Sequence, residues 1–175
     1  AGGEISFLDI VNGLFNNGFN ITLVLPEYND VYVEQLIDKT QRIYFLPYVV
    51  WGLDTINQAV IRKLIKIIDL ENIDAVYVNT IMIREPFRAA RIRGIPAINH
   101  VRELITGDEV LIREIRTTKE EIQEEVLSRT DFIIANSKAT AAFYEKKGRT
   151  FVVPNTIDVR QYDISNQLVP DSINI

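Results

Sequence analysis

The chain contains no cysteine and only one histidine, one methionine and one tryptophan among its 175 residues. Without cysteine it has neither disulfides nor thiolate metal sites, and a single histidine excludes a metal site built from several histidines. No apolar run reaches the roughly 18 residues of a membrane-spanning helix, and no secretory signal opens the sequence. The net charge of −5 argues against a general nucleic-acid binder, which is normally basic. These absences favour a cytoplasmic globular protein without nucleic acid as a partner.

Sequence motifs of several enzyme classes are also missing. No G-x-G-x-x-G fingerprint of dinucleotide binding occurs, and no G-x-S-x-G elbow marks a nucleophilic serine. A hydrophobic content of 47% and a charged content of 25% are typical of a folded protein. At this length one domain of ordinary size buries roughly 70% of the surface of its unfolded chain.

Short apolar runs alternate with longer amphipathic segments along the chain, which predicts alternating strands and helices. The predicted strands cover residues 21–25, 43–46, 75–78, 97–98, 132–135 and 150–153. The predicted helices cover residues 4–17, 32–39, 52–70, 84–93 and a segment from 138 that Gly148 ends. The charged region 103–129 is expected to hold a short turn and one surface helix, and residues 160–175 to be irregular. This order predicts an α/β fold with a Rossmann-like, doubly wound parallel sheet.

Both ends of the sequence resemble interrupted elements. Ala1-Gly2-Gly3-Glu4 is a turn of the kind that follows a strand, and residues 172–175 are typical of the entry to one. We therefore expect residues 1–158 to form a domain whose first strand is not included, and residues 159–175 to be a linker towards a further domain.

Polar residues follow several of the predicted strands, and open parallel sheets bind ligands at these carboxyl ends. The candidates are Asn79, His100, Arg102, Ser137, Lys138 and Asn155. Each also has an ordinary structural interpretation. Asn79 and Ser137 are suited to capping helices, a histidine in such a place often satisfies a backbone carbonyl, and Arg102 has Glu103 and Glu109 as ion-pair partners.

Gly2 and Gly3 lie before a predicted helix. Glycines let the backbone approach a phosphate, and free N–H groups with the helix dipole favour an anion there. Two glycines before a helix are more often only a tight turn, so both interpretations stay open. Lys138, near another helix start, is suited to reinforcing an anion site.

Residues 131–158 carry the most specific pattern of the chain. A strand ends in Ser137, and the next strand ends in Pro154-Asn155-Thr156-Ile157-Asp158. This segment resembles the end of the N-terminal domain in family 4 glycosyltransferases, where the turn reads proline-asparagine-glycine-x-aspartate. Thr156 stands where that family usually has glycine.

Two further segments share this resemblance. His100-Val101-Arg102-Glu103 matches the place where the family's histidine ends a strand and lines the sugar cleft. Gly2-Gly3-Glu4 is similar to the family's Gly-Gly-x-Glu loop, with one residue fewer between glycine and glutamate. The resemblance thus runs over nearly the whole chain.

The resemblance implies the N-terminal half of a two-domain GT-B glycosyltransferase. Such an enzyme transfers a sugar, here expected to be a hexose, from a nucleotide diphosphate sugar to a glycan or lipid-linked acceptor with retention of configuration. It implies His100 as the catalytic residue at the sugar and Gly2 and Gly3 at the donor diphosphate. Asn79, Arg102, Ser137, Lys138 and Asn155 are then expected in the cleft or at the acceptor, in polysaccharide biosynthesis.

The same resemblance implies neither a metal nor another cofactor, and the chain lacks the D-x-D pair of metal-dependent glycosyltransferases. The Glu-x7-Glu pattern that holds the donor in the family's C-terminal domain is also absent. The chain alone is therefore expected to be inactive.

Two basic helices have alternative interpretations. The residues concerned are Arg62, Lys63 and Lys66 on one helix and Arg84, Arg88, Arg91 and Arg93 on the next. Such charges usually form the solvated face of a packed helix. Alternatively, they dock the protein peripherally to the anionic inner face of a membrane, where a lipid-linked acceptor lies.

Two other classes of function remain open. One is a nucleotide-sugar epimerase of the same architecture, which needs acid and base carboxylates in its cleft. The other is a non-catalytic α/β sugar-binding module. A receiver domain is disfavoured because the strands end in Pro26, Asn79, His100 and Asn136 and not in an acidic cluster.

Overall fold

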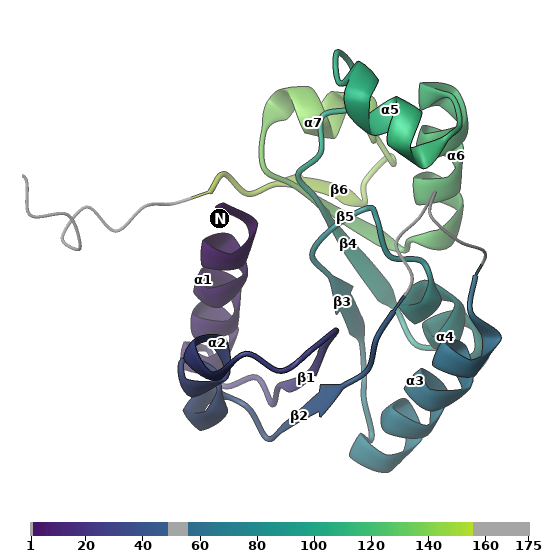
Figure 1. Ribbon diagram of the computed structural model, residues 1–175. Coiled ribbons are helices and arrows are strands. Elements are labelled where there is room, and N and C mark those ends of the chain that lie inside the picture. The colour runs from purple at the N-terminus through teal and green to yellow at the C-terminus, as the bar shows by residue number, and fades with distance from the viewer. Residues whose placement is uncertain (1, 49–55, 156–175) are drawn as a thin grey trace, which may run out of the picture.

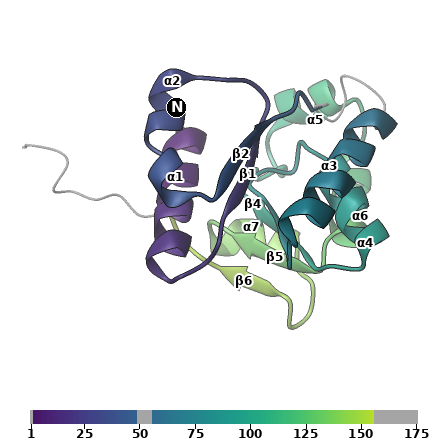
Figure 2. The same ribbon diagram turned by 90° about the horizontal axis from the view of Figure 1, so that it is seen from below.

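The computed structural model describes residues 2–48 and 56–155, which form an α/β fold with helices on both sides of parallel strands (Figures 1 and 2). The strands are β1 (Thr22–Leu25), β2 (Arg42–Phe45), β3 (Val76–Val78), β4 (Ala97–Val101), β5 (Phe132–Ala135) and β6 (Thr150–Val152). β1 pairs with β2, and the other four follow in the order β3-β4-β5-β6. Every pair is parallel, as the predicted fold class requires.

The helices connect these strands in the expected alternation. They are α1 (Gly2–Asn16), α2 (Asp30–Glu34), the 3-10 helix η1 (Ile37–Lys39), α3 (Gln58–Glu71), α4 (Glu85–Arg93), α5 (Glu109–Ile115), α6 (Lys119–Arg129) and α7 (Lys138–Phe143). Figures 1 and 2 show α1 on one side of the strands and α3 with α4 on the other. Because β3, β4 and β5 are parallel neighbours, their carboxyl ends meet along one edge of the sheet.

The charged region 103–129 differs from its prediction of one surface helix, because it forms two helices, α5 and α6. Arg116 ends α5 in a left-handed conformation, with φ of 59°. Thr118 then starts α6 through a reciprocal capping box with Glu121. α6 is not a surface element either, since it buries Ile122 and Val126 against the sheet.

Several boundaries also move. β4 extends to Val101, so His100 lies within the strand and not after it. α1 begins at Gly2, which places Gly2 and Gly3 in its first turn and not in a preceding loop. α7 ends at Phe143, before Gly148, and the predicted helix 32–39 divides into α2 and η1.

The start of α3 has a local cause. The side-chain oxygen of Asn57 accepts hydrogen bonds from the N–H groups of Ala59 and Val60, which fixes the first turn at Gln58. Residues 52–55 of the predicted helix 52–70 lie outside the described residues. The irregular region predicted from 160 onwards also lies outside them.

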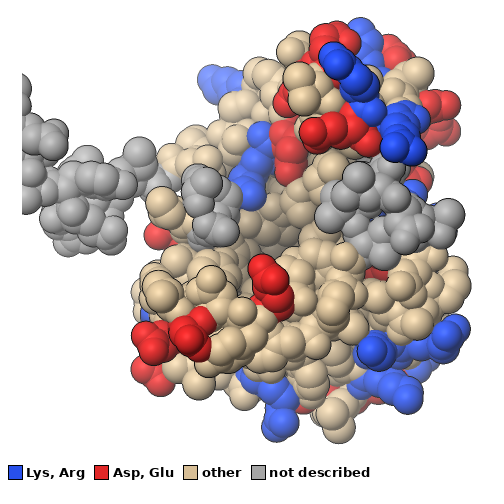
Figure 3. All heavy atoms as spheres, viewed as in Figure 1, with Lys and Arg blue, Asp and Glu red and all other residues tan. Residues whose placement is uncertain are grey.

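A cavity of about 1520 Å³ separates the two sheets. Strand β1 lines one side and β3 the other, and side chains of α1 and α3 also line it, among them Leu8 and Leu64. Figure 3 shows a hollow near the middle of the face in view, and uncharged residues form most of its visible walls. Among residues 2–48 and 56–155, β1 and β3 therefore face one another across a gap without pairing.

Candidate functional site at the carboxyl ends of the strands

His100 is the central side chain of the candidate site. It is 3% exposed, and its Nδ1 lies 2.8 Å from the hydroxyl of Tyr77 on the neighbouring strand β3. The two rings meet edge to face, with centroids 6.1 Å apart and planes at 84°. Nε2 is buried and has no hydrogen-bond partner among the described residues. The histidine is thus held by a side-chain hydroxyl, not by a backbone carbonyl.

Both members of this pair are neutral at pH 7. Burial and, to a smaller extent, the positive charge of Arg102 together lower the pKa of His100 to about 4. Burial also raises the pKa of Tyr77, an effect that Arg102 opposes. The site therefore presents a neutral imidazole with one ring nitrogen unused.

Asn79 follows β3 directly, and its side-chain oxygen is also buried without a partner among the described residues. It does not cap α4, because the residue before that helix is Arg84, without a side-chain cap. Buried polar atoms usually have a hydrogen-bond partner, so an atom without one in the protein often bonds to water or to a ligand. Asn79 and His100, both predicted site residues, each carry such an atom.

The turn after β3 is held by hydrogen bonds from two residues that sequence reasoning did not identify. Asn99, fully buried on β4, donates from its side-chain nitrogen to the carbonyls of Val78 and Thr80, at 3.2 and 2.8 Å. Arg129, 6% exposed at the end of α6, donates to the carbonyl of Ile81 at 2.6 Å. These bonds fix the loop that carries Asn79.

Arg129 is an unusual buried cation. Its guanidinium lies 3.4 Å from the Asn99 side-chain oxygen, 3.9 Å from Glu125 and 4.7 Å above the Phe87 ring. Burial lowers its pKa to about 10, against the opposing charge of Glu125, so the residue stays protonated at pH 7. Its place at the end of a charged helix gave no signal that it faces inwards.

Glu103 joins the ends of β3 and β4. One carboxylate oxygen accepts from the Thr80 hydroxyl at 2.6 Å, and the other accepts from the backbone N–H of Arg102 at 3.1 Å. Arg102 itself lines the cavity between the sheets, beside Asn79 and Thr80. The structure therefore brings Arg102 and Asn79 to one cavity.

The β5–α7 connection is mainly structural. Ser137 caps α7 by accepting from the N–H of Thr140 at 3.1 Å, and Asn136 accepts from the Thr140 hydroxyl at 3.0 Å. The side-chain nitrogen of Asn136 donates to the Arg102 carbonyl at 3.4 Å, which links β5 to the end of β4. Lys138 is exposed at the first position of this six-residue helix.

Asn155 lies beside the first turns of α1. Its side-chain oxygen accepts from the hydroxyl of Ser6 at 3.5 Å, across 149 positions of sequence. Figure 1 shows the start of α1 next to the segment after β6. Gly2 and Gly3 are thus in the same neighbourhood as Asn155, whereas Asp158 lies outside the described residues.

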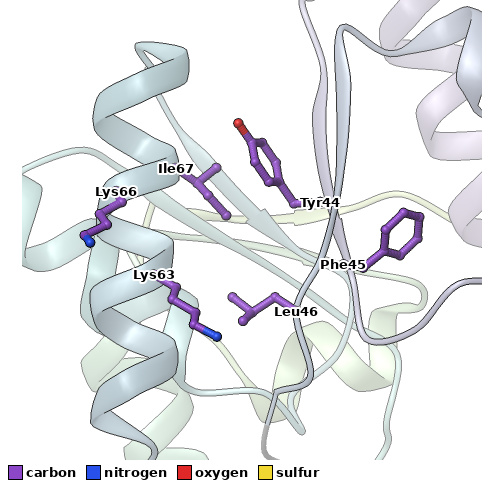
Figure 4. Close-up of a pocket in the computed structure, with 6 residues that line it drawn as sticks. All are labelled: Tyr44, Phe45, Leu46, Lys63, Lys66 and Ile67. Carbon is purple, nitrogen blue, oxygen red and sulfur yellow. The ribbon is translucent and has the colours of Figure 1, made fainter.

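Charged residues form two further features. Arg62, Lys63 and Lys66 are exposed on α3, while Arg93 pairs with Asp69 and Arg91 donates to the Ser128 carbonyl at 2.6 Å. A small pocket of about 240 Å³ lies between β2 and α3 (Figure 4). Its lining residues are Tyr44, Phe45, Leu46, Lys63, Lys66 and Ile67.

In residues 2–48 and 56–155, no group of three or more His, Asp or Glu side chains is placed to hold a metal ion. In the same part of the chain no helix has the length and apolar character needed to cross a membrane.

Solved structures with the same fold include HepE of Anabaena in three complexes, with UDP, with UDP and glucose, and with UDP-glucose. Each is 15% identical to this chain, with TM-scores of 0.64, 0.64 and 0.65. The likeness covers 91–93% of this chain but only 42–43% of HepE, so the chain spans about two fifths of that protein's length.

No curated protein matches the chain in sequence. A family model does match, and it covers residues 1–161 under the description Glycosyltransferase Family 4. The resemblance found in the motifs and the Rossmann-like parallel fold of a GT-B glycosyltransferase are both confirmed. The chain belongs to glycosyltransferase family 4.

Proposed function

We propose that this chain is the acceptor-side domain of a retaining glycosyltransferase, which moves a hexose from a nucleotide diphosphate sugar to a glycan or lipid-linked acceptor. Membership of the family supports the transfer, and the UDP-glucose complex of HepE supports a uridine nucleotide in the donor. The observation that carries the proposal is the buried, neutral His100, whose Nε2 has no partner among the described residues.

The unsatisfied atoms fit a sugar. His100 lies within β4 and Asn79 directly follows the neighbouring parallel strand β3. A sugar hydroxyl, which both donates and accepts hydrogen bonds, can pair with His100 Nε2 and with the Asn79 side-chain oxygen. A neutral imidazole at the sugar can form a hydrogen bond to a hydroxyl or to the charge that develops in the transition state. Glu103 is engaged by Thr80 and by the Arg102 backbone, so it is a structural carboxylate in this proposal. The leaving phosphate of the donor then acts as the base, which retains the configuration.

The donor diphosphate would lie at the start of α1. Gly2 and Gly3 form the first turn of a 15-residue helix, whose free N–H groups and dipole favour an anion. The Ser6–Asn155 contact brings the segment after β6 close to the beginning of this helix. Arg102, at the cavity between the sheets, supplies a positive charge for a phosphate or an acidic acceptor.

Residues 1–158 would form this domain together with one further strand in the cavity between β1 and β3. Two parallel edges face the cavity, and its walls are largely apolar on both sides. A buried parallel strand is apolar on both faces and pairs on both edges. The occupant we propose is an extended segment of the same polypeptide, N-terminal to Ala1. Residues 159–175 would then lead to a donor-binding domain.

The exposed lysines of α3 would bind the protein peripherally to a membrane. Lys63 and Lys66 flank the pocket beside β2 (Figure 4). With Arg62, which is exposed on the same helix, they form a basic surface suited to anionic headgroups. Peripheral contact with the inner face of a membrane would bring a lipid-linked acceptor to the enzyme, in polysaccharide biosynthesis. If vesicles of acidic phospholipid do not co-sediment the protein, this part of the proposal fails.

A thermal-shift panel of nucleotide diphosphate sugars on the intact gene product tests the proposed function. Wild type should be stabilised strongly by one donor, with UDP-glucose as the first to try. His100→Ala should keep its fold and lose transfer. No shift with any nucleotide sugar would favour a non-catalytic sugar-binding module, and interconversion of two donor sugars without transfer would favour an epimerase.

A further inference from the structure

Tyr77 and His100 form a pair that neither the family model nor the fold explains. Tyr77 is on β3 and His100 on β4, and the register pairs Tyr77 with Ile98, two residues before His100. The hydroxyl reaches diagonally across the strands to Nδ1 at 2.8 Å. The edge-to-face contact holds the same ring in a second way. Tyr77 therefore restricts both the position of the imidazole and the location of its proton.

The hydrogen bond has two possible directions. In one, the phenol O–H donates to an unprotonated Nδ1; in the other, Nδ1–H donates to the phenol oxygen. An unprotonated imidazole nitrogen is the stronger base of the two acceptors, and the phenol is the more acidic donor. We infer that Tyr77 is a positioning residue whose hydroxyl donates to His100 Nδ1 and thereby places the ring proton on Nε2.

The consequence is a fixed chemical role for the other ring nitrogen. With the proton on Nε2, His100 is a hydrogen-bond donor and not a base. Nε2 is buried, and an N–H without a partner in such a place is costly, so it calls for an acceptor oxygen on a ligand. Hydroxyl and phosphate oxygens both qualify. This consequence for catalysis rests on the proposed function, whereas the location of the proton does not.

The neutral state of the pair is consistent with this assignment. Burial disfavours the imidazolium, and Arg102 acts in the same direction, so the ring carries a single proton at pH 7. A single proton must be on one nitrogen or the other, and the partner of Nδ1 decides which. Sequence reasoning did not identify Tyr77, because an aromatic residue in an apolar strand is usually only part of the core.

The chain is well suited to a direct test, because His100 is its only histidine. The chain, purified without a histidine tag and labelled with ¹⁵N, gives two imidazole nitrogen signals in long-range ¹H–¹⁵N spectra at pH 7. Wild type should show a pyridine-type Nδ1 and a pyrrole-type Nε2. Tyr77→Phe should shift both signals towards the average, with the tautomer ratio reduced about fivefold, the effect of one net hydrogen bond.

Tyr144→Phe is the matched control. It also removes one buried hydroxyl, from a residue that packs in another part of the core, and should leave the His100 signals unchanged. If Tyr77→Phe fails to fold, the wild-type spectrum alone decides. A pyrrole-type Nδ1 in wild type, or unchanged signals in folded Tyr77→Phe, would overturn the inference.

The assay of transfer is separate from this spectrum. In the intact gene product, Tyr77→Phe should lower kcat several-fold more than it raises KM for the donor. If the spectra show the expected tautomer and its change in Tyr77→Phe, but wild type has no transfer activity, the proposed function is refuted and the inference about Tyr77 stands. If His100→Ala abolishes transfer, but the wild-type spectrum shows the proton on Nδ1, the proposed function stands and the inference is refuted.

Discussion

The Thr80 hydroxyl lies 2.6 Å from a carboxylate oxygen of Glu103, and this hydrogen bond joins the carboxyl ends of β3 and β4. Thr80 directly follows Asn79, and Glu103 directly follows Arg102. The bond therefore sets the spacing between two of the proposed cleft residues, and it is accessible to mutation without touching either.

Thr80→Val should destabilise the fold by about 1–3 kcal/mol, because it removes the hydroxyl and leaves a half-buried carboxylate oxygen without that partner. Urea denaturation of wild type and variant measures the loss. Thr117→Val is the control, since Thr117 donates to Glu121 at an exposed position and its loss should be about 0.5 kcal/mol or less. Equal losses in the two variants would contradict a special role for the Thr80–Glu103 bond.

Arg129→Met should destabilise by about 2–4 kcal/mol. The thioether side chain keeps much of the volume but leaves the Ile81 carbonyl and the Asn99 side-chain oxygen without their donor. Arg149→Met is a fair comparison, because Arg149 is exposed and lies above the Phe132 ring, at 5.8 Å. Its change should stay within about 0.5 kcal/mol. An Arg129 variant as stable as wild type would show that the buried network does not hold the loop.

His100 should make stability depend on pH in a defined window. Its pKa of about 4 in the folded protein lies below the ordinary histidine value of 6.5, so the unfolded chain binds the proton first as the pH falls. The contribution of the neutral histidine to the free energy of unfolding is present in full above pH 6.5 and declines as the pH falls towards 4. It amounts to about 3 kcal/mol at most. Urea denaturation between pH 7.5 and 4 measures it.

His100→Gln provides the reference for that pH series. Carboxylates also titrate near pH 4, and they are common to both proteins, so the difference between wild type and variant isolates the histidine. As the pH falls through this window, the free energy of unfolding should decrease more in wild type than in the variant. A constant difference from pH 7.5 to 4 would mean that the histidine has an ordinary pKa.

A strand added before Ala1 should complete the sheet. We predict that six valine, isoleucine and leucine residues, joined by a short turn, protect the amides of Val24 and Tyr77 from hydrogen exchange by at least about tenfold. These two amides face the cavity, because the Leu25 carbonyl and the Val76 N–H are directed to the opposite edges, towards Leu46 and Pro96.

The same extension with a central proline is the control for that experiment. Proline lacks the N–H that an internal strand needs, so it should give little protection. Equal protection with and without proline would mean that the extension does not pair in the cavity. Amide exchange measured by NMR distinguishes this from general stabilisation, because the amides of α4 should be unaffected in both proteins.

The sequence was sufficient to predict the alternation of strands and helices and the parallel fold, because hydrophobic periodicity and caps such as Ser137 are local signals. It was also sufficient to place His100, Asn79 and Arg102 near one edge. It misplaced the end of β4, since Asn99 and His100 are polar residues that tertiary contacts bury inside a strand.

The partners of those residues were beyond such reasoning. Tyr77 and Arg129 belong to the site because of pairings across neighbouring strands and between a helix end and a loop, and neither has a signal in its own segment. The role assigned to Ser137 depends on the same kind of information. Its hydroxyl caps α7, so its place in the cleft stays a prediction.

The most direct test of the central claim is the affinity of the intact gene product for UDP-glucose and for UDP, measured by titration calorimetry in wild type and His100→Gln. If His100 Nε2 bonds the sugar, the variant should bind UDP-glucose about tenfold more weakly and UDP as well as wild type does. Equal affinities of wild type and variant for UDP-glucose, or the same loss for both ligands, would contradict a role for His100 at the sugar.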